Sequence, residues 1–215
     1  LPVPNRAQWR QAIEQVAAEA EPGESVLKLI LSRGVEHGPA PTAWVTLARA
    51  ADNTRARSEG LKVAVLDRGY GAQAGADAPW LLLGAKTLSY AVNMAAVREA
   101  KRRGADDAVF VSSDGYLLEG PTSSLLLRIG DTFVTPEPGA GILHGTTQLS
   151  VFDYLAQQGH ATEYRLVRAG ELPDADAAWL LSSIRLAAPI TAVDGRDLPV
   201  DHALTDAINA YLLSP

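Results

Sequence analysis

The sequence predicts an α+β protein, in which helices and strands form a mixed α/β arrangement. Segments with helical periodicity alternate with short apolar runs typical of strands along most of the 215 residues. Few helical segments separate the strands expected between residues 108 and 135, and this disfavours a purely parallel sheet. The sequence contains no internal repeat and no low-complexity tract.

The size and composition are those of a globular protein with one large or two small domains. Apolar residues make up 47% and charged residues 20% of the chain. No run approaches the roughly 20 apolar residues that a membrane span needs, so we expect no membrane association. The net charge of −6 argues against nucleic acid as a partner. An anionic small-molecule substrate stays open, because a local arginine pocket does not show in the net charge.

Residue usage also limits the chemistry. The chain has no cysteine, which excludes disulfides, thiolate metal sites and a cysteine nucleophile. Its four histidines are far apart in the sequence, so we expect no metal site. The chain begins Leu1-Pro2-Val3-Pro4, without an initiator methionine or a signal-like segment, and we therefore expect a fragment or a protein lacking its N-terminal part. A cytoplasmic location is the default expectation.

The first third of the chain predicts one helix and three strands. Asn5 can cap a helix over residues 6–20, whose apolar face carries Trp9, Ile13, Val16 and Ala20. The strands are expected over residues 25–32, 43–48 and 60–66. Residues 69–79 are rich in glycine and alanine and predict a linker. We therefore expect a small α/β domain over residues 1–75 and a larger domain over residues 76–215.

The larger domain is predicted to mix helices with hairpins. A helix over residues 88–103 has an apolar stripe made of Leu88, Ala91, Val92, Ala95 and Ala96. An antiparallel meander follows, with strands over residues 108–111, 116–119, 124–129 and 132–135. The rest predicts a helix from Thr146 or Thr147, strands over 161–167, 178–181 and 190–193, a loop over 182–188 and a helix over 202–213.

Lys86 stands out among the four lysines. It follows the apolar run of residues 80–85, which is expected to take its amine out of water. Desolvation lowers the pKa of a lysine, and a neutral amine can form a Schiff base. A lysine that extends from a strand end into solvent is the ordinary alternative, and this spacing alone favours that alternative.

Two further features are individually weak. Gly145-Thr146-Thr147 opens a helix, whose free N–H groups and dipole can bind an anion. A threonine that only caps a helix after a glycine gives the same sequence pattern. Ser182-Ser183 can add hydroxyls. Glu119 follows two leucines at a predicted strand end, so it is either half-buried and in need of a cationic partner or an edge residue in water.

Together a lysine, a carboxylate and a helix N-terminus fit pyridoxal phosphate (PLP), which needs an amine for its aldehyde, an acid at its ring nitrogen and an anion site. Three segments resemble the class IV aminotransferase family, the fold-type IV PLP enzymes. They are Lys86-Thr87-Leu88-Ser89-Tyr90, residues 116–124 (YLLEGPTSS) and residues 141–148 (GILHGTTQ). The similarity extends over nearly the whole chain. It implies a small N-terminal domain, incomplete here, and a larger PLP-binding domain with an antiparallel-rich sheet or barrel and flanking helices.

The resemblance implies roles for individual residues. Lys86 carries the cofactor through a Schiff base and moves protons, and Glu119 pairs with the ring nitrogen. Further cofactor contacts are implied for Tyr90, Thr122, Ser123, Thr146, Thr147 and Ser183. Substrate-binding roles are implied for Arg33 and, less directly, His37. Arg185 is a candidate for a substrate carboxylate, with a surface or phosphate-side arginine as an equal alternative. Gln148 departs from the family, in which many members have arginine there.

The variants of these motifs look most like the aminodeoxychorismate lyase branch. The implied reaction eliminates pyruvate from aminodeoxychorismate to give p-aminobenzoate, a folate precursor. The alternative is a transaminase for D-amino or branched-chain amino acids, and a remote alternative is a non-catalytic module of the same fold. The family further implies a homodimer, and a preceding sheet-and-helix unit with an arginine that reaches the cofactor phosphate.

Overall fold

A computed structural model describes residues 3–214, so the outer ends of the two predicted domains, at residues 1 and 215, lie outside the described residues. The chain divides into a first compact unit that ends at Asp52 and a second that begins at Asn53. The predicted boundary at residue 75 differs from this division. The third predicted strand, β3 (Leu61–Asp67), hydrogen-bonds to two strands of the second unit and belongs to its sheet.

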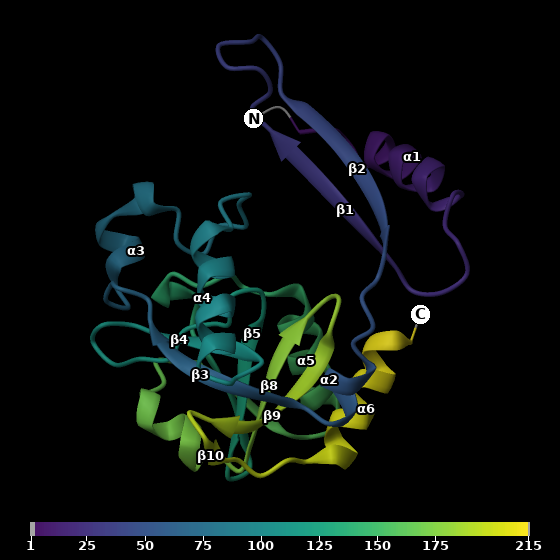
Figure 1. The fold of residues 1–215 in the computed structure, drawn as a ribbon. Coiled ribbons are helices and arrows are strands. Elements are labelled where there is room, and N and C mark those ends of the chain that lie inside the picture. Colours follow the sequence, from purple (N-terminus) through teal and green to yellow (C-terminus); the bar gives the residue numbers. More distant parts are fainter. Residues whose placement is uncertain (1–2, 215) are drawn as a thin grey trace. The chain divides into compact units, whose positions relative to one another are not determined.

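The first unit is a hairpin with one helix packed on it (Figure 1). Helix α1 (Arg6–Ala17) begins at a reciprocal cap between Asn5 and Gln8, and its Trp9, Ile13 and Val16 are half-buried on the predicted face. The helix ends three residues before the predicted end, and Ala20 lies outside it and is exposed. Strands β1 (Ser25–Ser32) and β2 (Thr42–Arg49) pair antiparallel over their whole length. Within its described residues no side chain is fully buried, because three elements enclose little volume.

The second unit is built on a mixed sheet with the strand order β4-β3-β9-β8-β5-β6-β7, and β10 pairs with β9. Parallel pairs join β3 to β4 and β9, and β6 to β7, while the other pairs are antiparallel, which confirms the predicted mixed α/β class. The strands other than β3 are β4 (Asp107–Val111), β5 (Ser124–Ile129), β6 (Thr132–Pro136), β7 (Ala161–Arg165), β8 (Ala177–Ser182), β9 (Leu186–Val193) and β10 (Arg196–Asp197).

Both faces of the central strands are buried. Alternate residues of β5 and β8, such as Leu125 and Leu180, join a cluster that also holds Val109 of β4 and Val134 of β6. Since β4 and β6 lie far apart in the strand order, the sheet curves until its two ends share this core. The opposite face of β5 and β8 packs against α5 (Thr146–Gln157) and α6 (His202–Leu213), whereas α4 (Ala91–Arg102) covers β3 and β4. The short helices α2 (Thr54–Ser58) and α3 (Ala74–Asp77) complete the unit.

Some local predictions were wrong. Residues 69–79 are not an interdomain linker, because Ala72 is buried in the core under α4. Residues 116–119 make isolated bridges rather than a strand, since Leu117 donates to Val167 while Leu118 donates to Phe110. The meander over 108–135 is therefore divided, with β4 parallel to β3. Strand β9 also takes in residues 186–188, the last part of the loop expected over residues 182–188.

The predicted apolar stripe of the helix after Lys86 is also wrong. The helix begins at Ala91 rather than residue 88, and its buried residues are Ala96 and Ala100. Leu88 and Val92 are 68% and 57% exposed. The sequence pattern identifies an apolar face, but it does not say whether this chain or another molecule covers that face.

None of the helices in the described part of the chain is long and apolar enough to cross a membrane.

Candidate active site

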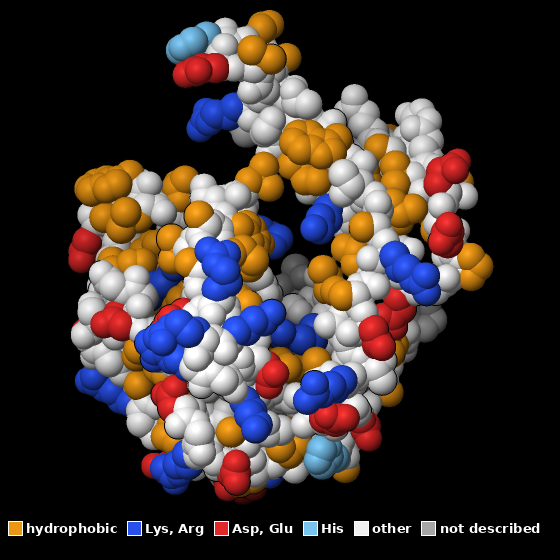
Figure 2. Space-filling view, viewed as in Figure 1, with side chains coloured by type: hydrophobic (Ala, Val, Ile, Leu, Met, Phe, Trp, Pro, Cys, Tyr) orange, Lys and Arg blue, Asp and Glu red, His pale blue; other side chains and the backbone are white. Residues whose placement is uncertain are grey.

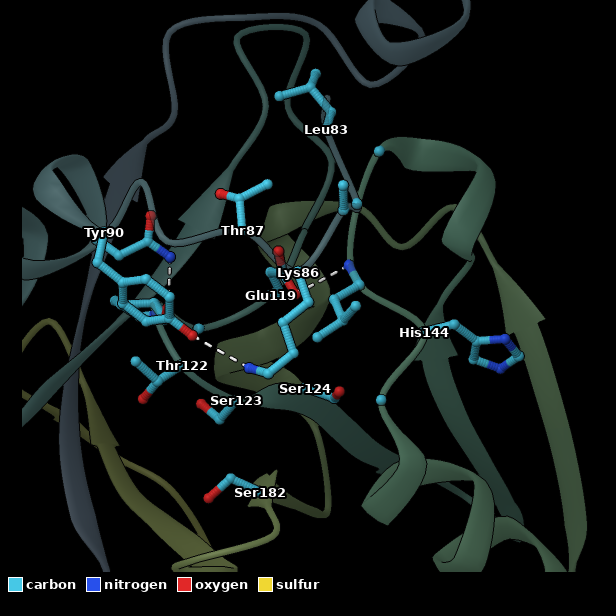
Figure 3. A pocket seen from close by; sticks show the side chains of 18 of the residues that line it. Leu83, Lys86, Thr87, Tyr90, Glu119, Thr122, Ser123, Ser124, His144 and Ser182 are labelled. Carbon is cyan, nitrogen blue, oxygen red and sulfur yellow. Dashed lines mark hydrogen bonds between the residues drawn. The ribbon is translucent and has the colours of Figure 1, made fainter. Parts of the chain in front are cut away.

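One cavity of about 370 Å³ in the second unit collects the polar residues to which the sequence pointed (Figure 3). Its walls are the segment after β3, the turn before α4, the loop before β5, the start of α5 and the end of β8. Ser124 at the start of β5 pairs with Leu181 in β8, and this antiparallel register places the loop before β5 next to the end of β8. The predicted site residues that line it are Lys86, Tyr90, Glu119, Thr122, Ser123, Thr146, Thr147 and Ser183.

Lys86 lies in the turn that precedes α4. Its Nζ donates to the phenol oxygen of Tyr90 at 3.2 Å, across one helical step of four residues. The prediction that its flank takes the amine out of water was wrong: the lysine is exposed, and Trp80 and Leu82 before it are 76% and 61% exposed. The flank includes a short 3-10 helix over Pro79–Leu81, whose Trp80 and Leu81 lie at the surface. The amine is thus directed by Tyr90 rather than by an apolar lining.

Glu119 is half-buried and has little to compensate its charge. Its Oε2 accepts one hydrogen bond, from the Leu143 N–H at 3.1 Å. Burial raises the pKa of this carboxyl to about 7, against the lowering effects of that N–H and of the charges on Arg68 and Lys86. Near neutral pH the carboxyl is therefore balanced between its two forms, as expected for a buried acid that forms no ion pair among the described residues.

This pKa predicts a pH-dependent stability for the cofactor-free chain. Because the pKa of Glu119 is about 7 when folded and near 4.5 when unfolded, the folded state holds the extra proton between these values. The contribution of Glu119 to the free energy of unfolding then falls by about 3 kcal/mol as the pH rises through this window. Relative to wild type, Glu119→Gln is expected to gain that amount between about pH 5 and pH 8.

Urea unfolding at several pH values measures this difference. Glutamine keeps an acceptor for the Leu143 N–H, so the comparison isolates the charge. Glu163→Gln, on β7 and outside the cavity, is the control and is expected to follow the wild-type pH curve. Parallel curves for wild type and Glu119→Gln would contradict the buried ionisation.

The N-terminus of α5 opens onto the same cavity. Gly145 is the N-cap, and no side chain caps the helix, so the first-turn N–H groups are available to a ligand. A Cβ at Gly145 would come within 2.3 Å of the Ser124 hydroxyl oxygen, so glycine there lets this hydroxyl keep its position at the helix start. Thr147 is buried and Thr146 exposed, and both line the cavity. Helix dipole, N–H groups and hydroxyls together form a site suited to a phosphate or carboxylate.

Among the described residues of the second unit, Arg185 is the predicted site residue that is absent from the cavity lining. Arg185 does not line the cavity, because its guanidinium pairs with the buried Asp107. A direct contact with a substrate carboxylate, as expected for Arg185, does not match this position. Arg33 and His37 lie in the first unit, after β1, and their roles stay predictions.

Sequence reasoning missed two cavity residues that the end of β3 and α4 supply. Arg68 donates to the Tyr70 hydroxyl at 3.0 Å and lies over the Phe110 ring, and its charge favours the ionised form of Glu119. Asn93 donates to the Pro121 carbonyl and so ties α4 to the loop that carries Thr122. A charged residue directly after a buried strand was the available signal for Arg68, but the linker prediction over residues 69–79 obscured it.

A lysine amine, a half-buried carboxyl and a helix N-terminus around one cavity of a mixed sheet define an enzyme of the aminotransferase class. The model of the family "Amino-transferase class IV" matches residues 1–193, and the chain belongs to this family.

Individual relatives agree with this assignment. The bifunctional aminodeoxychorismate lyase / D-amino acid transaminase of Mycobacterium tuberculosis strain H37Rv is 42% identical over 230 aligned residues, which cover 100% of this chain and 79% of the relative. The fold IV-transaminase CpuTA1 from Curtobacterium pusillum is 51% identical with a TM-score of 0.93, covering 99% of this chain and 73% of that one.

A third comparison adds ligands. A hypothetical aminotransferase from Mycobacterium tuberculosis is 41% identical, and the match covers 99% of this chain and 78% of that one. It has been solved in a PLP-bound form, with a TM-score of 0.91, and in a form that holds α-ketoglutarate and PMP, with a TM-score of 0.93.

Proposed function

We propose that this chain is a PLP-dependent aminodeoxychorismate lyase, which eliminates pyruvate from aminodeoxychorismate to leave p-aminobenzoate for folate synthesis. The observation that carries the proposal is the meeting of the Lys86 amine, the Glu119 carboxyl and the start of α5 on one cavity. The bifunctional relative supports both this reaction and, as the second candidate, transamination of D-amino acids. A cytoplasmic location remains a prediction.

The residues present fit PLP. Glu119 is a half-buried acid with a raised pKa, so a cationic ring nitrogen supplies the partner that it lacks. The uncapped start of α5, with Thr147, suits a phosphate, and Ser183 and Thr146 lie on the same cavity. When bound, PLP supplies an aldehyde for amines and a ring that withdraws electrons from the substrate carbon.

Each side chain then has a defined task. Lys86 provides the amine that holds the cofactor and afterwards moves a proton at the substrate carbon. Tyr90 accepts the hydrogen bond of that amine and fixes its direction. Glu119, once ionised by a cationic partner, keeps the ring nitrogen protonated. Thr122 and Ser123 line the same cavity as Glu119. In this proposal Arg33, with His37, binds a carboxylate of the anionic substrate.

Product analysis separates the two candidate reactions. Purified chain supplied with PLP is incubated with aminodeoxychorismate, and in parallel with D-alanine and α-ketoglutarate. Release of p-aminobenzoate together with pyruvate supports the lyase. Pyruvate formed only with D-alanine, without aromatic product in the first reaction, identifies the transaminase. Branched-chain amino acids as donors test the other transaminase specificity.

A non-catalytic module of the same fold is tested by the cofactor bond itself. Borohydride reduction after incubation with PLP fixes a cofactor bound to lysine, and peptide mass spectrometry locates it. Modification at Lys86 supports an active enzyme. A chain that takes up PLP nowhere, or equally at all lysines, would refute the proposed function.

We further propose that the protein is a homodimer. Apolar side chains between residues 80 and 94 stay uncovered within their own unit, and Figure 2 shows such side chains gathered over α3 and the turn after it. The exposed apolar residues are Trp80, Leu81, Leu82, Leu88, Val92 and Met94. Several exposed apolar residues close together in the sequence, one of them aromatic, are typical of a protein interface.

Leu88→Asp is expected to weaken the dimer at least about 10-fold, since it places a charge in an apolar interface. Sedimentation across a dilution series measures the dissociation constant. Leu213→Asp, at an equally exposed leucine near the end of α6, is the control and is expected to leave the constant unchanged. A monomeric wild type at every concentration would contradict the assignment of this patch.

A further inference from the structure

Arg185 makes two side-chain contacts directly behind the cavity wall. Its Nη2 lies 2.8 Å from Oδ2 of Asp107 and 3.4 Å from the hydroxyl oxygen of Ser123. The side chains of Arg185 and Asp107 are 17% and 5% exposed. A terminal guanidinium nitrogen carries two N–H bonds, so one can be directed to the carboxylate and the other to the serine.

The contact with Arg185 determines the role of the Ser123 hydroxyl oxygen. A guanidinium only donates hydrogen bonds, and the Ser123 oxygen must therefore accept. The hydroxyl proton is then available for a different partner. Within residues 3–214 no acceptor for that proton is found, and Ser123 lines the cavity. A Cβ at Gly120 would lie 2.4 Å from the same oxygen, so glycine there lets the hydroxyl take this position.

Ser182 is held in the same way from the neighbouring strand. The backbone N–H of Arg185 donates to the Ser182 hydroxyl oxygen at 3.2 Å, which again leaves the hydroxyl proton unassigned among the described residues. Ser182 also lines the cavity, and the register of Ser124 with Leu181 makes the two serines neighbours across β5 and β8 (Figure 3). Residue 185 thus assigns both hydroxyl oxygens as acceptors, one through its backbone N–H and one through its guanidinium, and leaves both hydroxyl protons for other partners.

The buried pair is poorly explained by stability alone. Desolvation of two charges offsets much of their attraction, and the Arg185 Nε is buried without a hydrogen-bond partner among the described residues. An apolar pair would fill this volume at no greater cost, but it could not donate a hydrogen bond to the Ser123 hydroxyl.

We infer that Arg185, held by Asp107, is a positioning residue whose guanidinium presents the Ser123 hydroxyl as a hydrogen-bond donor to an oxyanion in the cavity. The neighbouring Ser182 hydroxyl, which accepts from the backbone N–H of residue 185, is a second donor that does not depend on the arginine side chain. The inference deepens the proposed function, and it rests on that function for the nature of the ligand. Two oxyanions can accept these hydrogen bonds, namely a phosphate of the cofactor or a carboxylate of the substrate. Arg185 itself touches neither.

The test uses inorganic phosphate and α-ketoglutarate as separate probes, titrated into the cofactor-free chain by calorimetry. Ser123→Ala is expected to weaken binding of at least one probe by about 10-fold, the effect of one hydrogen bond to a charged group. Arg185→Met is expected to have a similar effect. In the double variant the loss stays near about 10-fold instead of about 100-fold, because the two changes remove the same interaction.

Arg128→Met is the matched control, since Arg128 also pairs with an aspartate, Asp201, in a partly buried site that does not line the cavity. It is expected to lower the melting temperature without changing either affinity. If Arg185→Met does not fold, Asp107→Asn replaces it in the cycle, because asparagine keeps the shape and removes the charge that holds the guanidinium.

The outcomes are distinct. Weaker binding of phosphate, of α-ketoglutarate or of both in Ser123→Ala and Arg185→Met supports the inference, and the probe that is affected identifies the oxyanion. The inference would be overturned if Ser123→Ala lowered the affinity by the same factor in wild type and in Arg185→Met. Unchanged affinities in the single variants, or a wild type that binds neither probe, would also overturn it. PLP attachment at Lys86 is measured separately, so a failure of the proposed function and a failure of this inference can be told apart.

Discussion

Lys86→Ala is expected to abolish covalent uptake of PLP and to lower turnover at least about 10³-fold, because it removes both the amine that binds the cofactor and the group that moves the proton. The hydrogen bond from Lys86 to Tyr90 shows the amine directed across the cavity by a second side chain. Loss of an exposed side chain in a turn costs little stability. Absorbance at the edge of the visible range after addition of PLP, and p-aminobenzoate release, measure the two effects.

The control is a lysine of the same unit outside the cavity. Lys101 lies in the last turn of α4 and is exposed. Lys101→Ala is expected to keep both the absorbance band and the turnover of wild type. An undiminished band in Lys86→Ala would show that another amine carries the cofactor, and the assignment of the cavity would then be wrong.

Strong local signals predicted most elements of the fold. Helix α6 and strand β5 have the expected bounds, and α1 begins at the predicted cap of Asn5. In each case hydrophobic periodicity and an end signal agree, which makes the local sequence sufficient. The sequence also identified the lysine, the glutamate and the Gly-Thr-Thr turn as candidate site residues. Their meeting on one cavity is decided by the pairing of strands far apart in the chain.

What the sequence could not supply was the environment of each side chain. Lys86 was expected to be desolvated by apolar neighbours, but those neighbours are exposed within the unit. The sequence left Arg185 equally open as a ligand of a substrate carboxylate or as a surface or phosphate-side arginine. Its partner Asp107 is 78 positions earlier and meets it only through the fold. Spacing along the chain gives residue types and local direction, whereas burial and ion pairing depend on which distant segments fold together.

Glu119→Gln is expected to lower turnover by about 10²- to 10³-fold while leaving PLP attached at Lys86. In the cavity without ligand, burial raises the pKa of Glu119 to about 7. A cationic ring nitrogen nearby would stabilise the ionised carboxylate, and the carboxylate would in turn hold the proton on that nitrogen. Glutamine can still accept the Leu143 N–H bond, but it offers no charge to retain the proton.

Two properties distinguish this role from a structural one. The absorbance of the bound cofactor should keep its lysine-bound form, whereas the rate falls, and the decrease should appear in kcat more than in KM because electron withdrawal matters in the transition state. Glu163→Gln, which alters an exposed glutamate on β7, controls for the loss of one negative charge. Near-normal turnover in Glu119→Gln would mean that another acid holds the ring nitrogen, and within the described cavity lining Glu119 is the one carboxylate available.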